Sequence, residues 1–238
     1  MVNKEQGGII NGHEWIDLGL SVKWATCNIG ASSPGEPGDY FAWGETEPKS
    51  EYSWENYKFW VSGKYMKATF NKYCSGHEQN QEKLVQTSKF SWFNIFSKSN
   101  TLQKKQGLIG NKSCLDLSDD AAHANWGSPW RLPTKKELDE LVAECTWESA
   151  LLDKMRCYKV TSNRNGNYIY LPLSGLRMDN KIQSLDYVGH CWSSSLKTDE
   201  TYTAYGINFG YSSTFESDMV GWSSESRSYG LPVRPVSD

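Results

Sequence analysis

The sequence predicts an α+β fold in which short strands come first, two helices follow, and many short strands complete the chain. Three observations support this. Alternating apolar patterns fill the first 45 residues, helix-start signals lie between 118 and 145, and strand patterns separated by polar turns run from 158 to the end. Because helices and strands do not alternate along the chain, a parallel βαβ sheet is not expected.

The N-terminal segment is interpreted as three short strands. Residues 15–18 and 22–27 alternate apolar and polar side chains, and Gly19 marks a turn between them. A loop with two prolines covers 30–38, and the aromatic stretch 39–43 is the third strand. The segment therefore contributes small antiparallel elements rather than a helix.

Two helices are expected because their end signals are strong. Ser118 is a good N-cap for a helix that ends at Gly127, and Asp119 and Asp120 suit its positive end. Since Asp116 and its neighbours lack the spacing of an EF-hand calcium loop, we expect solvated carboxylates there. The second helix opens with a capping box and has one apolar stripe; the residues are Thr134, Glu137, Leu138, Leu141, Val142 and Cys145.

Strand patterns dominate the chain after the helices. Residues 158–161 and 167–171 flank the hairpin-turn signal 163–166. Four further strands are expected, at 191–195, 204–209, 219–223 and 233–236. The loops between them are rich in Ser, Thr, Asp, Glu and Tyr.

The length of 238 residues suits one large domain. We predict a single domain over 1–238 with an insertion at 76–112, which is polar at both ends and carries an aromatic run at 90–96. The apolar face of that run has to pack on the body of the protein or on a partner.

Composition excludes several classes of function. With a net charge of −3 and no basic stripe, binding to nucleic acid is not expected. No apolar run approaches the roughly 18 residues of a membrane span. Residues 1–12 have no apolar signal core, so either the chain is not secreted through this N-terminus or a leader has been removed. The six cysteines form no Cys-x-x-Cys pair, and we expect most to be buried thiols.

Motifs of catalysis are missing from the sequence. There is no Gly-x-Ser-x-Gly elbow, no phosphate-binding loop and no His-Glu-x-x-His motif, and the four histidines are far apart. The run 193–195 offers serines but no identifiable base. We therefore expect no catalytic residues, no metal site and no cofactor, and predict that the chain is not an enzyme.

Aromatic residues are unusually frequent, with 11 Trp and 13 Tyr. In the C-terminal segment Tyr205, Tyr211 and other rings lie among small polar residues, a composition typical of adaptable binding surfaces. The alternative is that these rings pack in the core or in loops. We assign the scaffold role to Trp192, Ser193, Trp222 and Gly230, and the binding role to the loop residues between them.

Seven stretches in this order resemble one family of Bacteroidetes, the Fibrobacter succinogenes major paralogous domain. They are EWIDLGL (14–20), KWATCNIGA (23–31), GDYFAWGET (38–46), DDAAHANWG (119–127), WRLPT (130–134), CWSSS (191–195) and VRPV (233–236). The resemblance covers nearly the whole chain. It implies a C-type-lectin-like fold with small twisted antiparallel sheets, two helices and long C-terminal loops.

The resemblance also implies a function. Similar proteins are variable proteins of diversity-generating retroelements, which display a diversified surface that binds a ligand. The implied ligand-binding positions are Leu196, Lys197, Asp199, Tyr202, Tyr205, Asn208, Tyr211 and Ser213. The partner would be a protein or glycan on a cell surface, and the protein itself would lie at the cell surface, outside the cell or on a phage particle; the oligomeric state stays open.

Two alternatives stay open: an enzyme similar to sulfatase-modifying factors, and a structural subunit of a cell-surface or phage assembly. Those enzymes use a pair of cysteines near the C-terminus, whereas this chain has only Cys191 there. The segment 76–112 is also longer and more aromatic than the family's usual connection, which is compatible with a partner-binding feature or a lid.

Overall fold

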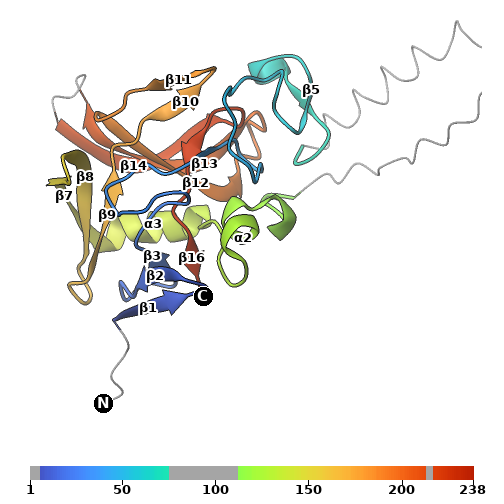
Figure 1. Ribbon diagram of the computed structural model, residues 1–238. Helices are drawn as coiled ribbons and strands as arrows, with labels where there is room; N and C mark the ends of the chain where they lie inside the picture. The colour runs from blue at the N-terminus through green and yellow to red at the C-terminus, as the bar shows by residue number, and fades with distance from the viewer. Residues whose placement is uncertain (1–5, 75–111, 213–216) are drawn as a thin grey trace, which may run out of the picture.

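The computed structural model describes residues 6–74, 112–212 and 217–238, and shows an α+β arrangement of small antiparallel sheets with two α-helices in these ranges. The predicted insertion at 76–112, apart from Lys112, lies outside the described residues. Figure 1 shows the helix α3 below a three-stranded sheet, with the smaller sheets around them. The N-terminal half contributes short strands: β1 (Gly7–Ile10), β2 (His13–Ile16), β3 (Lys23–Ala25), β4 (Tyr40–Phe41), β5 (Trp60–Ser62) and β6 (Thr69–Phe70).

The first sheet joins the two ends of the described chain. Its strand order is β1-β2-β3-β16, and the last strand β16 (Val236–Ser237) pairs antiparallel with β3. The strand β15 (Leu231–Pro232) pairs with β4 in the same way. The predicted strands at 15–18, 22–27, 39–43 and 233–236 are therefore present at these places but are shorter or shifted, since the flanking residues form turns.

The helix α2 (Ala121–Trp126) begins two residues later than predicted. A 3-10 helix occupies Leu117–Asp119, so the N-cap is Asp120 and not Ser118. The Asp120 side chain accepts hydrogen bonds from the backbone N–H of His123, at 3.0 Å, and of Leu132, at 2.8 Å. Gly127 ends the helix with φ 75°, as expected.

Buried carboxylates contradict the prediction that this acidic stretch is solvated. Asp119 and Asp120 are 5% and 3% exposed. Asp119 accepts from the Lys58 Nζ and Tyr73 Oη atoms, both at 2.8 Å, and pairs with Lys72. The carboxylate therefore ties the segment around 58–73 to the start of α2.

The helix α3 (Lys135–Glu144) has the predicted capping box between Thr134 and Glu137. Leu138 and Leu141 are buried, at 1% and 0% exposure, so the apolar stripe faces a core. Cys145 is buried too, but it is the first residue of a strand that follows the helix without a loop. This strand was not predicted.

A second sheet follows α3 as a meander of three strands: β7 (Cys145–Leu152), β8 (Met155–Ser162) and β9 (Tyr168–Pro172). The predicted hairpin around 163–166 is confirmed, because it joins β8 to β9. A short hairpin of β10 (Leu176–Met178) and β11 (Lys181–Gln183) comes next.

The third sheet consists of the longest strands: β12 (Val188–Leu196), β13 (Thr203–Ser212) and β14 (Ser217–Ser226), with β13 in the middle. Strands were predicted at 191–195, 204–209 and 219–223, and each extends further. The register pairs Cys191 with Ile207 and Ile207 with Trp222 across the sheet. Because side chains alternate along a strand, these residues share one face, and His190 and Asn208 share the other.

Two apolar cores lie on the two sides of this sheet. Ile207 and Phe209 pack with Leu138 and Leu141 of α3 in one core. The other core holds Trp192, with the aromatic residues of the N-terminal half. The sheet is thus the central layer of the molecule.

Two fully buried arginines connect the cores to the loops. The Arg227 guanidinium donates to the Tyr57 hydroxyl and to the carbonyls of Thr201, Tyr73 and Lys72, at 3.0 to 3.2 Å. The Arg234 guanidinium donates to Asn28 Oδ1, at 2.8 Å, and to three backbone carbonyls of distant segments. Each one holds together parts of the chain that are far apart in sequence.

Within the described ranges, no helix combines the length and the apolar character needed to cross a membrane.

Candidate functional site

Three side chains form a partly exposed cluster on the third sheet, which we call the aromatic corner: Lys135, Tyr205 and Trp222. The rings of Tyr205 and Trp222 meet edge to face, with centroids 6.0 Å apart. The Lys135 Nζ atom lies 5.4 Å from the Tyr205 centroid and 5.6 Å from that of Trp222. Trp222 is 58% exposed, so its assignment to the scaffold was wrong.

The backbone around the aromatic corner is fixed by secondary structure. Tyr205 is on the middle strand β13, Trp222 is on its neighbour β14, and Lys135 is the first residue of α3. The Lys135 backbone N–H donates to Ser195 Oγ at 3.0 Å, which ties the start of α3 to β12. A ligand that contacts these rings therefore meets a surface whose shape is already set.

A charged loop after β12 lies beside the aromatic corner. The Lys197 ammonium pairs with the Glu200 carboxylate at 2.8 Å. The pKa of Lys197 is raised, first by the hydrogen bond to Glu200 and further by the charges of Glu200, Asp199 and Tyr205, while slight burial opposes the rise. The structure thus brings together three of the predicted ligand-binding residues, Lys197, Asp199 and Tyr205.

The other predicted positions lie elsewhere. Leu196 is only 4% exposed and belongs to a core, because the strand turns its side chain inward; its placement on the binding surface was therefore wrong. Tyr202 is half-buried against the same core. Asn208 is on the opposite face of the sheet from Tyr205, since the two are an odd number of residues apart. Ser213 lies outside the described residues.

Tyr211 shares the face of Tyr205 but lies at the other end of β13. It is 54% exposed and lines a pocket of about 440 Å³ together with Leu151 and Tyr187. Six residues of extended strand span roughly 20 Å. Tyr211 and the aromatic corner are therefore separate surfaces.

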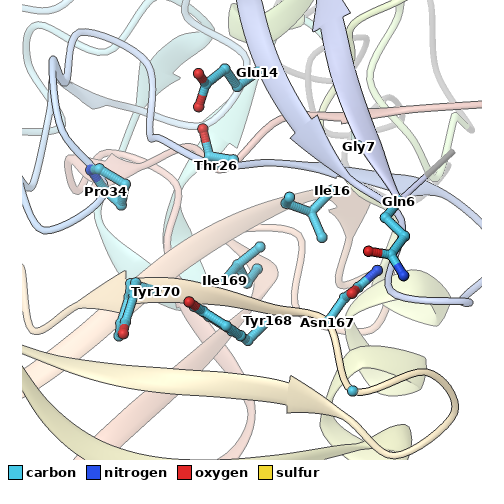
Figure 2. A pocket seen from close by; sticks show the side chains of 11 residues that line it. Gln6, Gly7, Glu14, Ile16, Thr26, Pro34, Asn167, Tyr168, Ile169 and Tyr170 are labelled. Atoms are coloured by element: carbon cyan, nitrogen blue, oxygen red, sulfur yellow. The ribbon is translucent and has the colours of Figure 1, made fainter.

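A groove on another side of the molecule offers a second candidate surface. Figure 2 shows Glu14 and Thr26 on one side of it and the rings of Tyr168 and Tyr170 on the other. The pocket has a volume of about 430 Å³. The two tyrosine rings meet edge to face, 5.6 Å apart. Aromatic walls with a few polar groups are typical of ligand pockets.

The groove continues into an adjoining pocket of about 580 Å³ that shares Glu14, Thr26 and Pro34. There the His13 and Trp126 rings stack with centroids 3.7 Å apart. Burial lowers the pKa of His13, which keeps the imidazole neutral at pH 7.

Most of the six cysteine thiols lie in the interior. Cys145, Cys157 and Cys191 are buried, as expected for most of the cysteines. Burial raises the pKa of Cys191 to about 11, so its thiolate is scarce at neutral pH. In the parts of the chain that the structure describes, no three His, Cys, Asp or Glu side chains are grouped to hold a metal ion.

Sequence reasoning missed Lys135 and the groove tyrosines. Lys135 follows the N-cap of a helix, and nothing in its neighbourhood signals a contact with strands some 70 to 90 residues later. Tyr168 and Tyr170 did carry a signal, because alternation in the predicted strand 167–171 places them on one face.

Comparisons with models of protein families, with curated proteins and with solved structures give no match.

Proposed function

We propose that this protein is a non-catalytic recognition protein that binds a protein or glycan on a cell surface through the aromatic corner and the loop 197–200. The observation that carries the proposal is the Trp222 ring, which is 58% exposed yet held against Tyr205 on two paired strands. A large exposed ring on a rigid strand gives contact area with little loss of conformational entropy on binding.

The charges around the rings support the same use. Lys135 places a cation near both rings, and Lys197 and Glu200 stand at the rim. Such groups donate hydrogen bonds to a polar ligand and accept hydrogen bonds from it, while the rings provide the apolar contact. Interfaces of this composition, an aromatic centre with a polar rim, concentrate their binding energy in a few residues.

A C-type-lectin-like fold fits this arrangement. The short paired strands, two helices and a C-terminal antiparallel sheet follow the order that the sequence resemblance implies. Trp192 and Ser193 are buried under the sheet, as expected of a scaffold. We extend the proposal to diversification of exposed positions such as Lys197, Asp199 and Tyr205; a reverse-transcriptase gene and an adenine-differing template repeat beside the gene would support it.

The alternative of an enzyme similar to sulfatase-modifying factors requires a reactive cysteine pair. Cys191 is 1% exposed and its raised pKa disfavours the thiolate. Cys114 is the exposed cysteine, and its backbone bridges to Ser195 of β12, whereas Cys191 points into a core from the same strand. These facts favour recognition over thiol catalysis.

Binding to intact cells tests the proposal and identifies the ligand class. The fluorescently labelled protein is applied to a panel of bacterial and host cells, either untreated, oxidised with periodate, or treated with protease. Loss of binding after periodate points to a glycan, and loss after protease points to a protein. If no cell type binds the wild-type protein more than the Trp222→Ala variant, the proposal fails.

A further inference from the structure

The opposite face of the C-terminal sheet carries a second, polar cluster. The register places His190, Asn208 and Gly221 side by side across β12, β13 and β14. Ser223 and Glu225 follow Gly221 on the same face of β14, because they are two and four residues further on. Gly206 lies opposite Ser223 and has no side chain, which leaves room for His190 and Glu225 to approach each other.

Two polar groups of this cluster are buried without a hydrogen bond. His190 is 6% exposed and Ser223 is 8% exposed. The His190 Nδ1 atom and the Ser223 Oγ atom have no hydrogen-bond partner among the described residues. The Nδ1 atom lies 4.0 Å from the Glu225 carboxylate, which is too long for a hydrogen bond. Buried polar atoms in this state point to a missing partner.

The face of β14 next to this cluster is open at Gly221. A methyl group added to Gly221 would meet nothing within 4 Å. The Glu225 side chain is 21% exposed, so the cluster is open to solvent at this carboxylate. A small group can therefore reach the Glu225 carboxylate from outside, and contact with the buried His190 Nδ1 and Ser223 Oγ atoms requires the Glu225 side chain to shift.

The cluster offers acceptors and lacks a cation. Burial raises the pKa of Glu225 to about 7, although the nearby Ser223 hydroxyl opposes this without reaching full hydrogen-bond geometry. Burial lowers the pKa of His190 to about 4, so the imidazole is neutral at pH 7. Apart from His190, no basic side chain in the described ranges pairs with Glu225. A buried carboxylate without a cation is costly.

We propose that the cluster of His190, Ser223 and Glu225 is a binding site for a primary ammonium group, carried by a small amine or by a lysine side chain. An ammonium has three N–H donors. The cluster supplies three acceptors for them: the Glu225 carboxylate, the Ser223 Oγ atom and the unprotonated His190 Nδ1 atom. The site lies on the face opposite the aromatic corner and does not depend on the function proposed there.

The proposal has a pH signature. Among the described residues, the ionisable groups that face Glu225 are His190 from β12 and Tyr229 from the turn after β14. Burial lowers the pKa of His190 and raises the pKa of Tyr229, so both are neutral between pH 6 and 8. A bound ammonium favours the Glu225 carboxylate and so lowers its pKa. Affinity should therefore increase about tenfold from roughly pH 6 to roughly pH 8.

A ligand-observed NMR titration of the full chain tests the site. Butylammonium and Nα-acetyl-lysine methylamide are the two probes, which separate a small amine from a lysine side chain. Three compounds serve as controls. Butanol lacks the charge, tetramethylammonium lacks the N–H donors, and Zn²⁺ needs metal ligands. We expect at least one ammonium probe to bind ten times more tightly than butanol and tetramethylammonium.

Variants make the result specific. Glu225→Gln should weaken ammonium binding about tenfold at pH 8 and remove the pH dependence, whereas Glu148→Gln on the exposed side of β7 should change neither. Ser223→Ala, which removes the Oγ acceptor without altering a charge, should weaken binding in a protein that remains folded by circular dichroism. Any one of three results overturns the proposal. They are butanol binding as tightly as the ammonium probes, binding of Zn²⁺ but of no ammonium probe, and an unchanged affinity for the ammonium probes in both site variants.

Discussion

Trp222 stands directly opposite Ile207 in the register of the C-terminal sheet, yet Ile207 is 1% exposed and Trp222 is 58% exposed. Both side chains are on the same face, on which α3 packs. Ile207 packs with Leu138 and Leu141, whereas the Trp222 ring lies beside Lys135, the first residue of α3. Two residues that face each other on neighbouring strands thus differ completely, since one is in the core and the other is a ring on the surface.

This pair gives the first prediction. Trp222→Ala should change the free energy of unfolding by no more than about 0.5 kcal/mol, because the ring is mostly in water. Ile207→Ala should lower it by about 2–5 kcal/mol, because it removes buried methyl groups and leaves a cavity. Urea denaturation followed by circular dichroism measures both. A large loss for Trp222→Ala would show that the ring is structural.

The second prediction concerns Arg227. Its guanidinium is fully buried and bonded to the Tyr57 hydroxyl and three carbonyls, so Arg227→Met removes all four of these hydrogen bonds from the interior. We expect the free energy of unfolding to fall by about 3 kcal/mol or more. Arg156→Met, at an exposed position of β8, is the matched control and should be nearly neutral. A neutral Arg227→Met would contradict the buried network.

The third prediction concerns acid stability. Burial raises the pKa of Asp119, but hydrogen bonds from Lys58, Lys72 and Tyr73 outweigh it and hold the pKa below its usual range. A lowered pKa means that the folded protein binds the proton less readily than the unfolded chain does. The stabilisation is therefore complete at neutral pH and is lost as pH falls through the folded pKa, below about pH 4.

Asp119→Asn tests this sign. The variant should be less stable than wild type by about 2–3 kcal/mol at pH 7, and the difference should shrink when unfolding is measured near pH 3. Asp153→Asn, at an exposed turn, serves as the control. A difference that stays constant or grows in acid would mean that Asp119 is not the group responsible.

The fourth prediction separates recognition from thiol chemistry. Cys114 is exposed, whereas Cys145, Cys157 and Cys191 are buried and burial raises the pKa of each. Iodoacetamide should modify Cys114 in the native protein and the other three only after denaturation. Mass spectrometry of peptides measures the order. Rapid alkylation of native Cys191 would revive the enzymatic alternative.

Local signals predicted much of the fold. The capping box at Thr134, the Gly127 stop and the 163–166 turn each depend on neighbours within a few residues, and all three are present. The prediction failed where a distant contact decides the structure. Asp119 was expected in water, but it is buried by lysines that lie 47 and 61 positions earlier in the sequence.

The candidate site was also predicted only in part. The family resemblance implied Lys197, Asp199 and Tyr205, which the structure does bring together, but it also implied Leu196, which the β12 strand turns into a core. Trp222 was assigned to the scaffold because large rings are usually buried. Its exposure depends on which distant residues pack over this part of the sheet, a tertiary fact that no local pattern contains.

Binding by two single-site variants tests the central claim most directly. Once a binding cell type or its isolated ligand is in hand, dissociation constants are measured for wild type, for Trp222→Ala in the aromatic corner and for Tyr168→Ala in the groove. We predict that Trp222→Ala weakens binding at least tenfold and that Tyr168→Ala leaves it within twofold, a difference of about 1.4 kcal/mol or more. Unchanged binding by Trp222→Ala together with a loss in Tyr168→Ala would contradict the account and move the site to the groove.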